Sequence, residues 1–440
     1  MAMNGRTITT NQVDQQPLPG NRAALTMLLL AFTLSITDRM ILSILFPDIQ
    51  AEFGVSDTQL GLLGGLSFAI FYATLGIPIA RLADRHSRKW IIAISLALFS
   101  LMTFLSGWAT GFIMLLLLRI GVGIGEAGVN PASHSIIADY FPAHRRSFAM
   151  AILTLGANLG MMLGFVGGGL VAESYGWRMA LMVVGAPGLV LTFVFLRVLR
   201  EPPRGTFEQE AQSTAPSLGE AAAYMWRKRA MRHLIIGSTI TGMISYGLSS
   251  WLPSMLIRSH EVSQSQAGLL MAGVFGILGA IGALTAGKLC DRLSRKGFQY
   301  GIWLIAGTQV FSGPFFIMAF LADDLNNMLM LFIIPAFTAN FYLGPTLALV
   351  QTLSPVPMRA VASAIKMLCM NLIGLGLGPL AVGILSDAFT PYFGEDALNM
   401  AMAVFILLGL WGAFHFWLCG RAMAGDDSLP QTPEGDGHTQ

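Results

Sequence analysis

The sequence has very little charge for its length. Only 11% of its 440 residues are Asp, Glu, Lys or Arg, whereas 54% are hydrophobic. A water-soluble domain typically carries about 25% charged residues, so this chain cannot cover a surface that faces water on all sides. The composition therefore excludes an ordinary soluble enzyme, a disordered protein and a nucleic-acid-binding protein.

Cysteine and catalytic motifs are also scarce. The three cysteines, Cys290, Cys369 and Cys419, form no CxxC motif, so neither a disulfide framework nor a zinc site is expected. The sequence contains no Walker A motif and no HExxH or Ser/His/Asp arrangement. We therefore expect no enzymatic activity, no metal and no cofactor.

Long apolar runs dominate the sequence instead. A helix that crosses a bilayer needs about 20 mostly apolar residues. Twelve segments meet this requirement: 24–46, 60–81, 90–107, 112–138, 147–170, 178–198, 232–257, 266–287, 298–320, 328–352, 361–386 and 397–420. A polar stretch at 199–230, whose later part is a candidate surface helix, separates six helices from six. We expect an all-α membrane protein with two bundles, residues 24–198 and 231–421.

The basic residues predict how these helices are oriented. Lys and Arg cluster in loops on one side, at 81–89, 145–146, 197–232 and 288–296, whereas loops on the other side carry mainly acids. Cytoplasmic loops are enriched in Lys and Arg. We therefore expect the basic side, the tails 1–23 and 422–440 and the linker 199–230 to lie in the cytoplasm, with the helices in a bacterial inner membrane.

One basic loop occurs twice, once in each half of the chain. Residues 80–89 read ARLADRHSRK, and residues 287–296 read GKLCDRLSRK, so the two copies align without gaps. A glycine pattern at 160–169 recurs in part at 374–379. Repeated halves at matched spacing are expected of transporters built from parallel repeats.

The two loops resemble the signature cytoplasmic loop of the major facilitator superfamily, G-x-L-x-D-R-x-G-R-R/K, with Ala80 in place of the first Gly and Ser87 and Ser294 in place of the later one. The resemblance covers about residues 24–420. It implies the major facilitator fold: 12 transmembrane helices in two pseudo-symmetric six-helix bundles around a central cavity, working by alternating access. It also implies a gating role for the loop Asp, which pins the inner ends of neighbouring helices and favours the outward-open state. The gating candidates are Asp84, Arg85, Arg88, Asp291 and Arg145.

Four charged residues lie deep in the predicted helices of the first half: Asp38, Arg39, Arg119 and Glu126. Each costs about 2.5–3.5 kcal/mol to insert, so a functional role is the default hypothesis. Arg119 and Glu126 are two turns apart and share a helix face, whereas adjacent residues diverge by about 100°, so Asp38 and Arg39 differ in how directly they face the cavity.

We predict that Glu126 and Asp38 couple transport to protons, because a carboxylate whose hydration changes with conformation changes its proton affinity. Arg39 and Arg119 would hold these carboxylates ionised or bind an anionic group. The alternative is a static cluster of ion pairs that only joins the two helices.

The residues around these charges narrow the resemblance. Thr37-Asp38-Arg39 in the first helix and Gly125-Glu126-Ala127 in the fourth resemble the Spinster-like branch of the superfamily. Eukaryotic members of that branch carry lysophospholipids or sphingosine-1-phosphate. The resemblance implies that Asp38, Glu126 and Arg119 are the functional polar residues. Organic-anion/proton symporters share the Asp-Arg pair, so that pair alone does not identify the branch.

We expect no charged residue deep within a helix of the second half. Its cavity candidates are polar but uncharged: Tyr246, Asn340, Tyr342, Thr346 and Asn371. A charged half beside a largely apolar one suits an amphiphile. We therefore expect a monomeric, proton-coupled secondary transporter of an anionic, lipid-like solute such as a lysophospholipid or sphingolipid. Its partners would be the lipid bilayer and its substrate, with no nucleic acid. The alternatives are a proton symporter for a small organic anion and a drug exporter.

Overall fold

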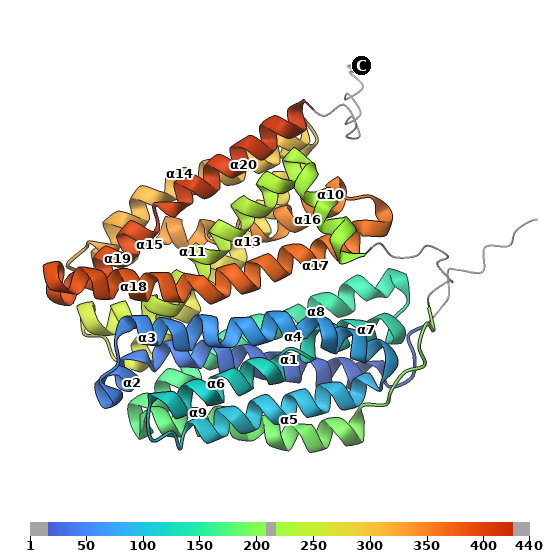
Figure 1. Ribbon diagram of the computed structural model, residues 1–440, viewed down its shortest axis with the longest axis horizontal. Helices are drawn as coiled ribbons and strands as arrows, with labels where there is room; N and C mark the ends of the chain where they lie inside the picture. Colours follow the sequence, from blue (N-terminus) through green and yellow to red (C-terminus); the bar gives the residue numbers. More distant parts are fainter. Residues whose placement is uncertain (1–15, 208–216, 426–440) are drawn as a thin grey trace, which may run out of the picture.

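The computed structural model describes residues 16–207 and 217–425, and the remaining parts of the predicted tails and linker lie outside these ranges. Within the described residues the chain forms helices and no strands, arranged as two bundles (Figure 1). We call residues 21–198 the N-half and residues 229–424 the C-half. The linker helix α10 (Leu218–Arg227) precedes the C-half, at the position where the sequence favours a surface helix.

Most membrane-crossing helices consist of consecutive elements. The N-half contains α1 (Asn21–Ile44), α2 (Phe46–Phe53), α3 (Asp57–Gly61), η1 (Leu62–Leu66), α4 (Ser67–Arg85), α5 (Arg88–Ser106), α6 (Phe112–Glu126), α7 (Val129–Tyr140), α8 (Ala143–Met162), η2 (Leu163–Gly167) and α9 (Gly168–Val198). The C-half contains α11 (Arg229–His260), α12 (Gln264–Met271), η3 (Ala272–Leu278), α13 (Gly279–Ser294), α14 (Phe298–Phe320), α15 (Leu325–Thr338), α16 (Leu343–Leu353), η4 (Val356–Met358), α17 (Arg359–Cys369), η5 (Met370–Leu375), α18 (Gly376–Phe393), η6 (Gly394–Asp396), α19 (Ala397–Phe405) and α20 (Leu408–Ala424).

These elements give the predicted twelve membrane-crossing helices. Nine helical stretches of the described residues are long and apolar enough to span a bilayer. Two of them, Ala143–Val198 and Val356–Ala424, are 56 and 69 residues long. Each is interrupted at a glycine with positive φ, Gly176 (83°) or Gly394 (57°), and so supplies two crossings. The 32-residue α11 supplies the last one.

A π-helical segment occurs in the second, fifth, eighth and eleventh of these helices, as η1, η2, η3 and η5. The positions correspond in the two halves, which fits the repeat seen in the sequence. These helices also form the contact between the halves: η1 packs against α18, and η2 packs against α12. π segments disrupt the regular helix and occur often at functional sites, and all four of these segments pack against the other half.

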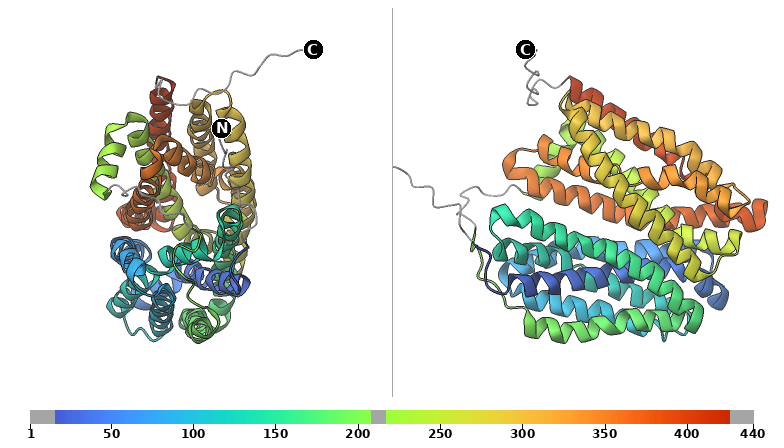
Figure 2. Two further views of the ribbon diagram at one scale, coloured as in Figure 1. Left: turned by 90° about the vertical axis from the view of Figure 1, so that its right-hand side faces the viewer. Right: turned by 180° about the vertical axis from the view of Figure 1, so that it is seen from behind.

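The two halves lie together at one end of the molecule and apart at the other. We call the end with the loops at 86–87 and 295–297 the basic end, and the end with Asp57 and Asp387 the acidic end. The bundles lie together at the acidic end, where α2, α3, α18 and α19 gather, and they diverge toward the basic end, where α7, α8, α10 and α17 lie (Figures 1 and 2).

Glycines allow backbone to touch backbone at the acidic end. A Cβ atom added to Gly268 in α12 would lie 2.2 Å from the carbonyl oxygen of Phe165 in η2. A Cβ atom on Gly383 in α18 would lie 2.3 Å from the carbonyl oxygen of Asp57 in α3. A side chain at either position would force the halves apart, so these glycines permit closure of the acidic end.

We expect Gly268→Ala to open the acidic end. The added methyl group overpacks the contact with Phe165, which costs about 1–3 kcal/mol in this form. Spin labels at residues 175 and 261, on opposite halves at this end, should report a longer distance. Gly273→Ala is the matched control, because a Cβ atom there meets nothing within 4 Å. Equal distances in the two variants would contradict this account of closure.

Candidate functional site

The four deep charges of the N-half form two ion pairs between α1 and α6. Arg119 Nη1 donates a hydrogen bond to Asp38 Oδ2 at 2.8 Å. Arg39 Nε donates to Glu126 Oε2 at 2.6 Å. Asp38, Arg119 and Glu126 are all at most 5% exposed. The charges therefore cancel pairwise inside the membrane.

The pairing is crosswise, and helix geometry explains it. Asp38 and Arg39 are neighbours whose side chains leave α1 about 100° apart, so they meet different parts of α6. Arg119 and Glu126 share one face of α6 but are separated along its axis by about 10 Å. The two residues on α6 thus each find their partner on α1 rather than each other.

The two pairs differ in their surroundings. Asp38 is fully engaged, because Thr103 of α5 donates a hydrogen bond to its Oδ1 while Arg119 occupies Oδ2. Glu126 receives hydrogen bonds from Ser35 (2.7 Å) and Arg39 at Oε2 only. Its other oxygen, Oε1, is buried without a hydrogen-bond partner among the described residues. A carboxyl with one open oxygen has room for a proton.

Aromatic rings hold both arginines. The Arg39 guanidinium lies 4.8 Å from the ring centre of Phe68 and 4.4 Å from that of Tyr72, both on α4. The Arg119 guanidinium lies 5.3 Å from the Phe68 ring. The Arg39 side chain is 11% exposed, against 6% for Arg119 and 1% for Asp38. Of the neighbouring residues Asp38 and Arg39 on α1, Arg39 has the more exposed side chain.

The polar candidates of the C-half fall into two groups. Tyr246 on α11, Asn340 in the turn between α15 and α16, and Asn371 on η5 are half-buried. Tyr246 comes close enough to Arg39 to interact with it electrostatically across the two halves. Tyr342 and Thr346, by contrast, are 3% and 0% exposed, so they lie inside the C-half bundle.

The prediction that the C-half has no deep charge is wrong. Lys366 on α17 is 1% exposed, and its Nζ donates a hydrogen bond to Thr346 Oγ1 at 2.8 Å. The hydropathy pattern does not reveal it, because an apolar run tolerates one lysine near the basic end, where lysines are expected. No signal in the sequence separates a buried lysine at this depth from one that extends to the surface.

Sequence reasoning also missed a polar cluster at the acidic end. Arg258 on α11 donates two hydrogen bonds to the Asp57 carboxylate, both at 3.0 Å, and Ser386 on α18 donates a third at 2.6 Å. The backbone N–H groups of Asp57 and Thr58 donate to Asp387 at 3.0 and 2.8 Å. These contacts join the two halves. The one available signal was that Arg258 is among the few basic residues on the acidic side.

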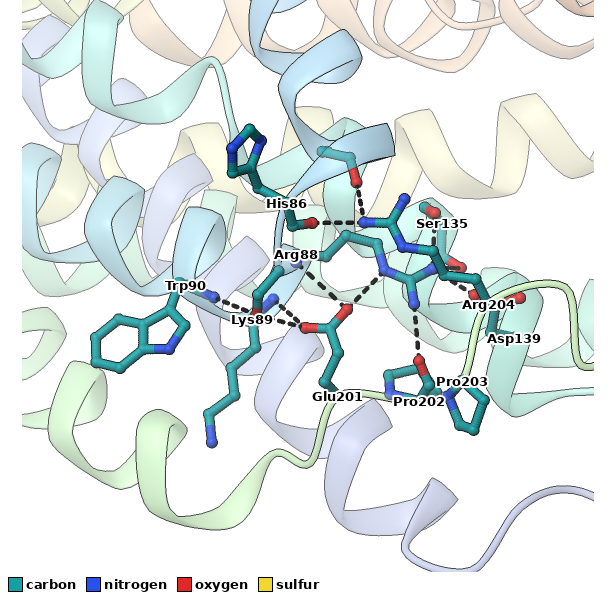
Figure 3. Close-up of polar contacts among 12 residues, drawn as sticks. His86, Arg88, Lys89, Trp90, Ser135, Asp139, Glu201, Pro202, Pro203 and Arg204 are labelled. Carbon is teal, nitrogen blue, oxygen red and sulfur yellow. Dashed lines mark hydrogen bonds and ion pairs between the residues drawn. The ribbon is translucent and has the colours of Figure 1, made fainter.

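At the basic end, Arg88 is buried within the N-half rather than between the halves (Figure 3). Its guanidinium pairs with Asp139 at the end of α7 and, at 2.8 Å, with Glu201 beyond the end of α9. Burial favours the neutral form of Glu201, but hydrogen bonds from Arg88, Lys89 and Ser87 outweigh it and hold the pKa of this carboxyl below its usual range. The cluster ties α5, α7 and the chain after α9 together.

The other gating candidates are exposed at this end. Asp84, Arg85, Arg145 and Asp291 are exposed, and none of their side chains has a hydrogen bond or ion pair within the described ranges. The loop is instead held through its backbone, since the Arg204 guanidinium donates to the carbonyl oxygens of Ala83 (2.8 Å), Asp84 and His86 (Figure 3). Over the same ranges no group of three His, Cys, Asp or Glu side chains could hold a metal ion.

Comparison with known proteins identifies the family. The model of the Major Facilitator Superfamily matches residues 28–379. An MFS-type efflux pump of Mycolicibacterium smegmatis is 32% identical over 416 residues, which cover 93% of this chain and 95% of the relative. Protein spinster homolog 1 of Homo sapiens is 28% identical over 429 residues, covering 90% of this chain and 80% of the relative.

A solved structure agrees with both the fold and the branch. The crystal structure of a bacterial homolog to the human lysosomal transporter Spinster, in an inward-facing and unoccupied conformation, superimposes with a TM-score of 0.84. The two chains are 28% identical, and the match covers 93% of this chain and 98% of the other. The chain therefore belongs to the major facilitator superfamily, in its Spinster-like branch, and is a secondary transporter rather than an enzyme.

Proposed function

We propose that this transporter couples the movement of an anionic, lipid-like amphiphile to protons, with Glu126 as the proton-binding group and Arg39 as the contact for the anion. It would work as a monomer without a cofactor. The observation that carries the proposal is the open Oε1 atom of Glu126, buried beside the most exposed of the four deep charges.

Protonation of Glu126 would free Arg39. While Glu126 is ionised, its Oε2 atom accepts the Arg39 Nε–H, and Arg39 Nη2 lies 2.5 Å away. A proton on Glu126 removes the negative charge, so the guanidinium becomes available to an anionic group from outside. Arg39 stays in place because Phe68 and Tyr72 hold its planar face. Proton and anion would therefore bind together.

Asp38 is the weaker proton candidate. Both of its oxygens already accept hydrogen bonds, one of them from a permanently charged arginine. An ionised Asp38 keeps both of these bonds, so it has no open oxygen for a proton. The Asp38–Arg119 pair would then fix α1 against α6, so that only the Arg39–Glu126 pair changes during the cycle.

The C-half supports an amphiphilic substrate. A pocket among α11, η3, α14, α15 and α20 holds about 740 Å³ of space, part of it open. Its wall is mainly apolar, with Ile244, Leu248, Phe316 and Phe332, and it includes Gln309, whose Oε1 is buried without a partner. Ligand pockets typically combine apolar walls with a few polar groups, as this one does. The pocket would accept an acyl chain while the headgroup meets Arg39.

The basic end would face the cytoplasm of a bacterium whose inner membrane holds the protein, because Lys and Arg concentrate there. With this orientation the form described here is inward-facing: the acidic end is closed and the basic end is open.

We expect Glu126→Gln to uncouple transport from the proton gradient. Glutamine keeps the shape of the side chain but takes up no proton. In the unaltered protein, acidification should raise the affinity for an anionic lysophospholipid by roughly 5- to 150-fold, the usual range of coupling between two sites. In the variant this increase should be much smaller. Binding and uptake in proteoliposomes are the measurements, with Glu395→Gln, an exposed position, as control. An increase in affinity of the same size in Glu126→Gln would refute the assignment.

The class of substrate is tested by comparing how strongly different ligands stabilise the protein against heating. A lysophospholipid with a phosphate headgroup should stabilise the purified protein against heating, and Arg39→Ala should abolish that stabilisation. A short carboxylate such as gluconate should stabilise it much less, because it fills none of the apolar pocket. Stronger stabilisation by the short carboxylate would favour the small-anion symporter instead.

A drug exporter is the second candidate, favoured by the name of the Mycolicibacterium smegmatis relative and by the apolar wall of the pocket. An exporter of this kind would bind apolar cations as readily as anions. Stabilisation by an apolar cation that survives Arg39→Ala would support the exporter and contradict the proposal.

Substitution of two aspartates, one at each end of the molecule, should shift the balance between the form described here and the form with the acidic end open in opposite directions. Asp57→Asn weakens the contact with Arg258 and should open the acidic end. The Asp84 carboxylate has no hydrogen-bond or ion-pair partner among the described residues, so we propose that it serves the opposite form, and Asp84→Asn should favour the form described here. Distances between labels at residues 175 and 261 measure both effects. Shifts in the same direction would contradict the assignment of either gate.

A further inference from the structure

Lys366 carries a buried amine, and the proposed function gives it no role. It lies on α17, seven residues from the start of that helix at the basic end, or about 10 Å along the axis. A lysine at this depth normally extends its long side chain to the membrane surface. Lys366 does not, since it is 1% exposed.

The amine has one hydroxyl as its partner. Nζ donates to Thr346 Oγ1 at 2.8 Å, and the Thr346 hydroxyl donates in turn to the carbonyl oxygen of Tyr342 at 2.5 Å. Both Thr346 and Tyr342 are buried. The chain of hydrogen bonds thus ends on a neutral backbone group, and no negative charge enters it.

The elements packed against α17 supply no counter-ion. They are α10, α11, α16, η4 and η5. Their titratable side chains, with those of α17 itself, are Glu220, Tyr224, Arg227, Arg229, Arg232, His233, Tyr246, Arg258, His260, Arg359 and Cys369. Among the described residues none of them forms an ion pair or an electrostatic contact with Lys366.

A lysine without a counter-ion is unusual here, because the other deep charges are balanced. The four deep charges of the N-half cancel in two pairs, whereas a protonated Lys366 would stand alone. An ammonium group is costly to bury in the membrane interior, and a hydrogen bond to one hydroxyl offsets only part of that cost. A neutral amine avoids the cost and still donates its N–H to Thr346.

We propose that Lys366 is a second proton-exchange site, neutral in the form described here and protonated in the form with the acidic end open. This rests on the proposed proton coupling and adds a site in the C-half. On entry into the present form the Lys366 ammonium gives its proton to water at the basic end, and the electron pair of the N–H bond stays on Nζ. The reverse step restores the ammonium.

The fold connects this amine to the moving interface. Helix α17 continues through the π segment η5 into α18, which carries the Ser386 and Asp387 contacts to Asp57. Helix η5 also packs against α4 and η1 of the N-half. When the halves rock, the helix that bears Lys366 must move relative to the N-half, and its enclosure changes with it.

The test compares two substitutions in the full chain in lipid nanodiscs, followed by label distances at residues 175 and 261. Lys366→Arg introduces a cation that stays charged. It should reduce the population of the form with the acidic end closed by about tenfold or more. Lys366→Met, similar in length and always neutral, should retain that population. Lys288→Met, at an exposed lysine, is the control.

A second comparison separates this site from Glu126. In the Glu126→Gln background, a pH-dependent change of the label distance should remain, and Lys366→Met should remove it. If Lys366→Met leaves that change intact, or if Lys366→Arg behaves like the unaltered protein, the proposal is overturned. Failure of Glu126→Gln to alter transport would instead refute the proposed role of Glu126, because the Lys366 comparison is read from distances alone.

Discussion

A charge inside a membrane must be neutralised, and the Arg39–Glu126 and Arg119–Asp38 pairs meet this requirement in the N-half. Each pair bridges α1 and α6, so the charges that would oppose insertion instead fix two helices against each other. Buried ion pairs are seldom a large net source of stability. Their value here lies in the difference between them: one carboxylate is fully bonded, and the other has an oxygen free for a proton.

Other contacts in the molecule would allow protonation of Glu126 to change how the two halves are arranged. The Arg88 cluster ties α5, α7 and the chain after α9 together at the basic end of the N-half. At the acidic end the halves touch through glycines and through Asp57, Arg258 and Asp387, and such specific contacts can form and break. π segments in the four interface helices place irregular backbone where these contacts change.

The sequence predicts the architecture well because its signals are local. Apolar runs locate the helices, the repeated loop indicates two related halves, and the comparisons confirm the family and branch. The four deep charges stand out for the same reason, since each interrupts an apolar run. Their crosswise pairing could not be predicted, because it depends on how α1 and α6 are rotated against each other.

Residues near the membrane surface were harder to interpret. Asp57 and Arg258 lie where charges are common, so their contact across the halves carries no signal in the sequence. Lys366 was missed because the pattern does not say whether a long side chain reaches the surface or folds inward. Within residues 16–207 and 217–425 the Asp84 carboxylate has no hydrogen-bond or ion-pair partner, so its gating role stays a prediction that another conformation must test.

The most direct test of the central claim is to observe the proton on Glu126. Infrared difference spectra of the full chain in lipid, recorded between alkaline and acidic pH, detect the C=O band of a carboxyl group that becomes protonated. The account predicts such a band in the unaltered protein and in the Glu395→Gln control, and its loss in Glu126→Gln. A band that persists unchanged in Glu126→Gln would contradict it.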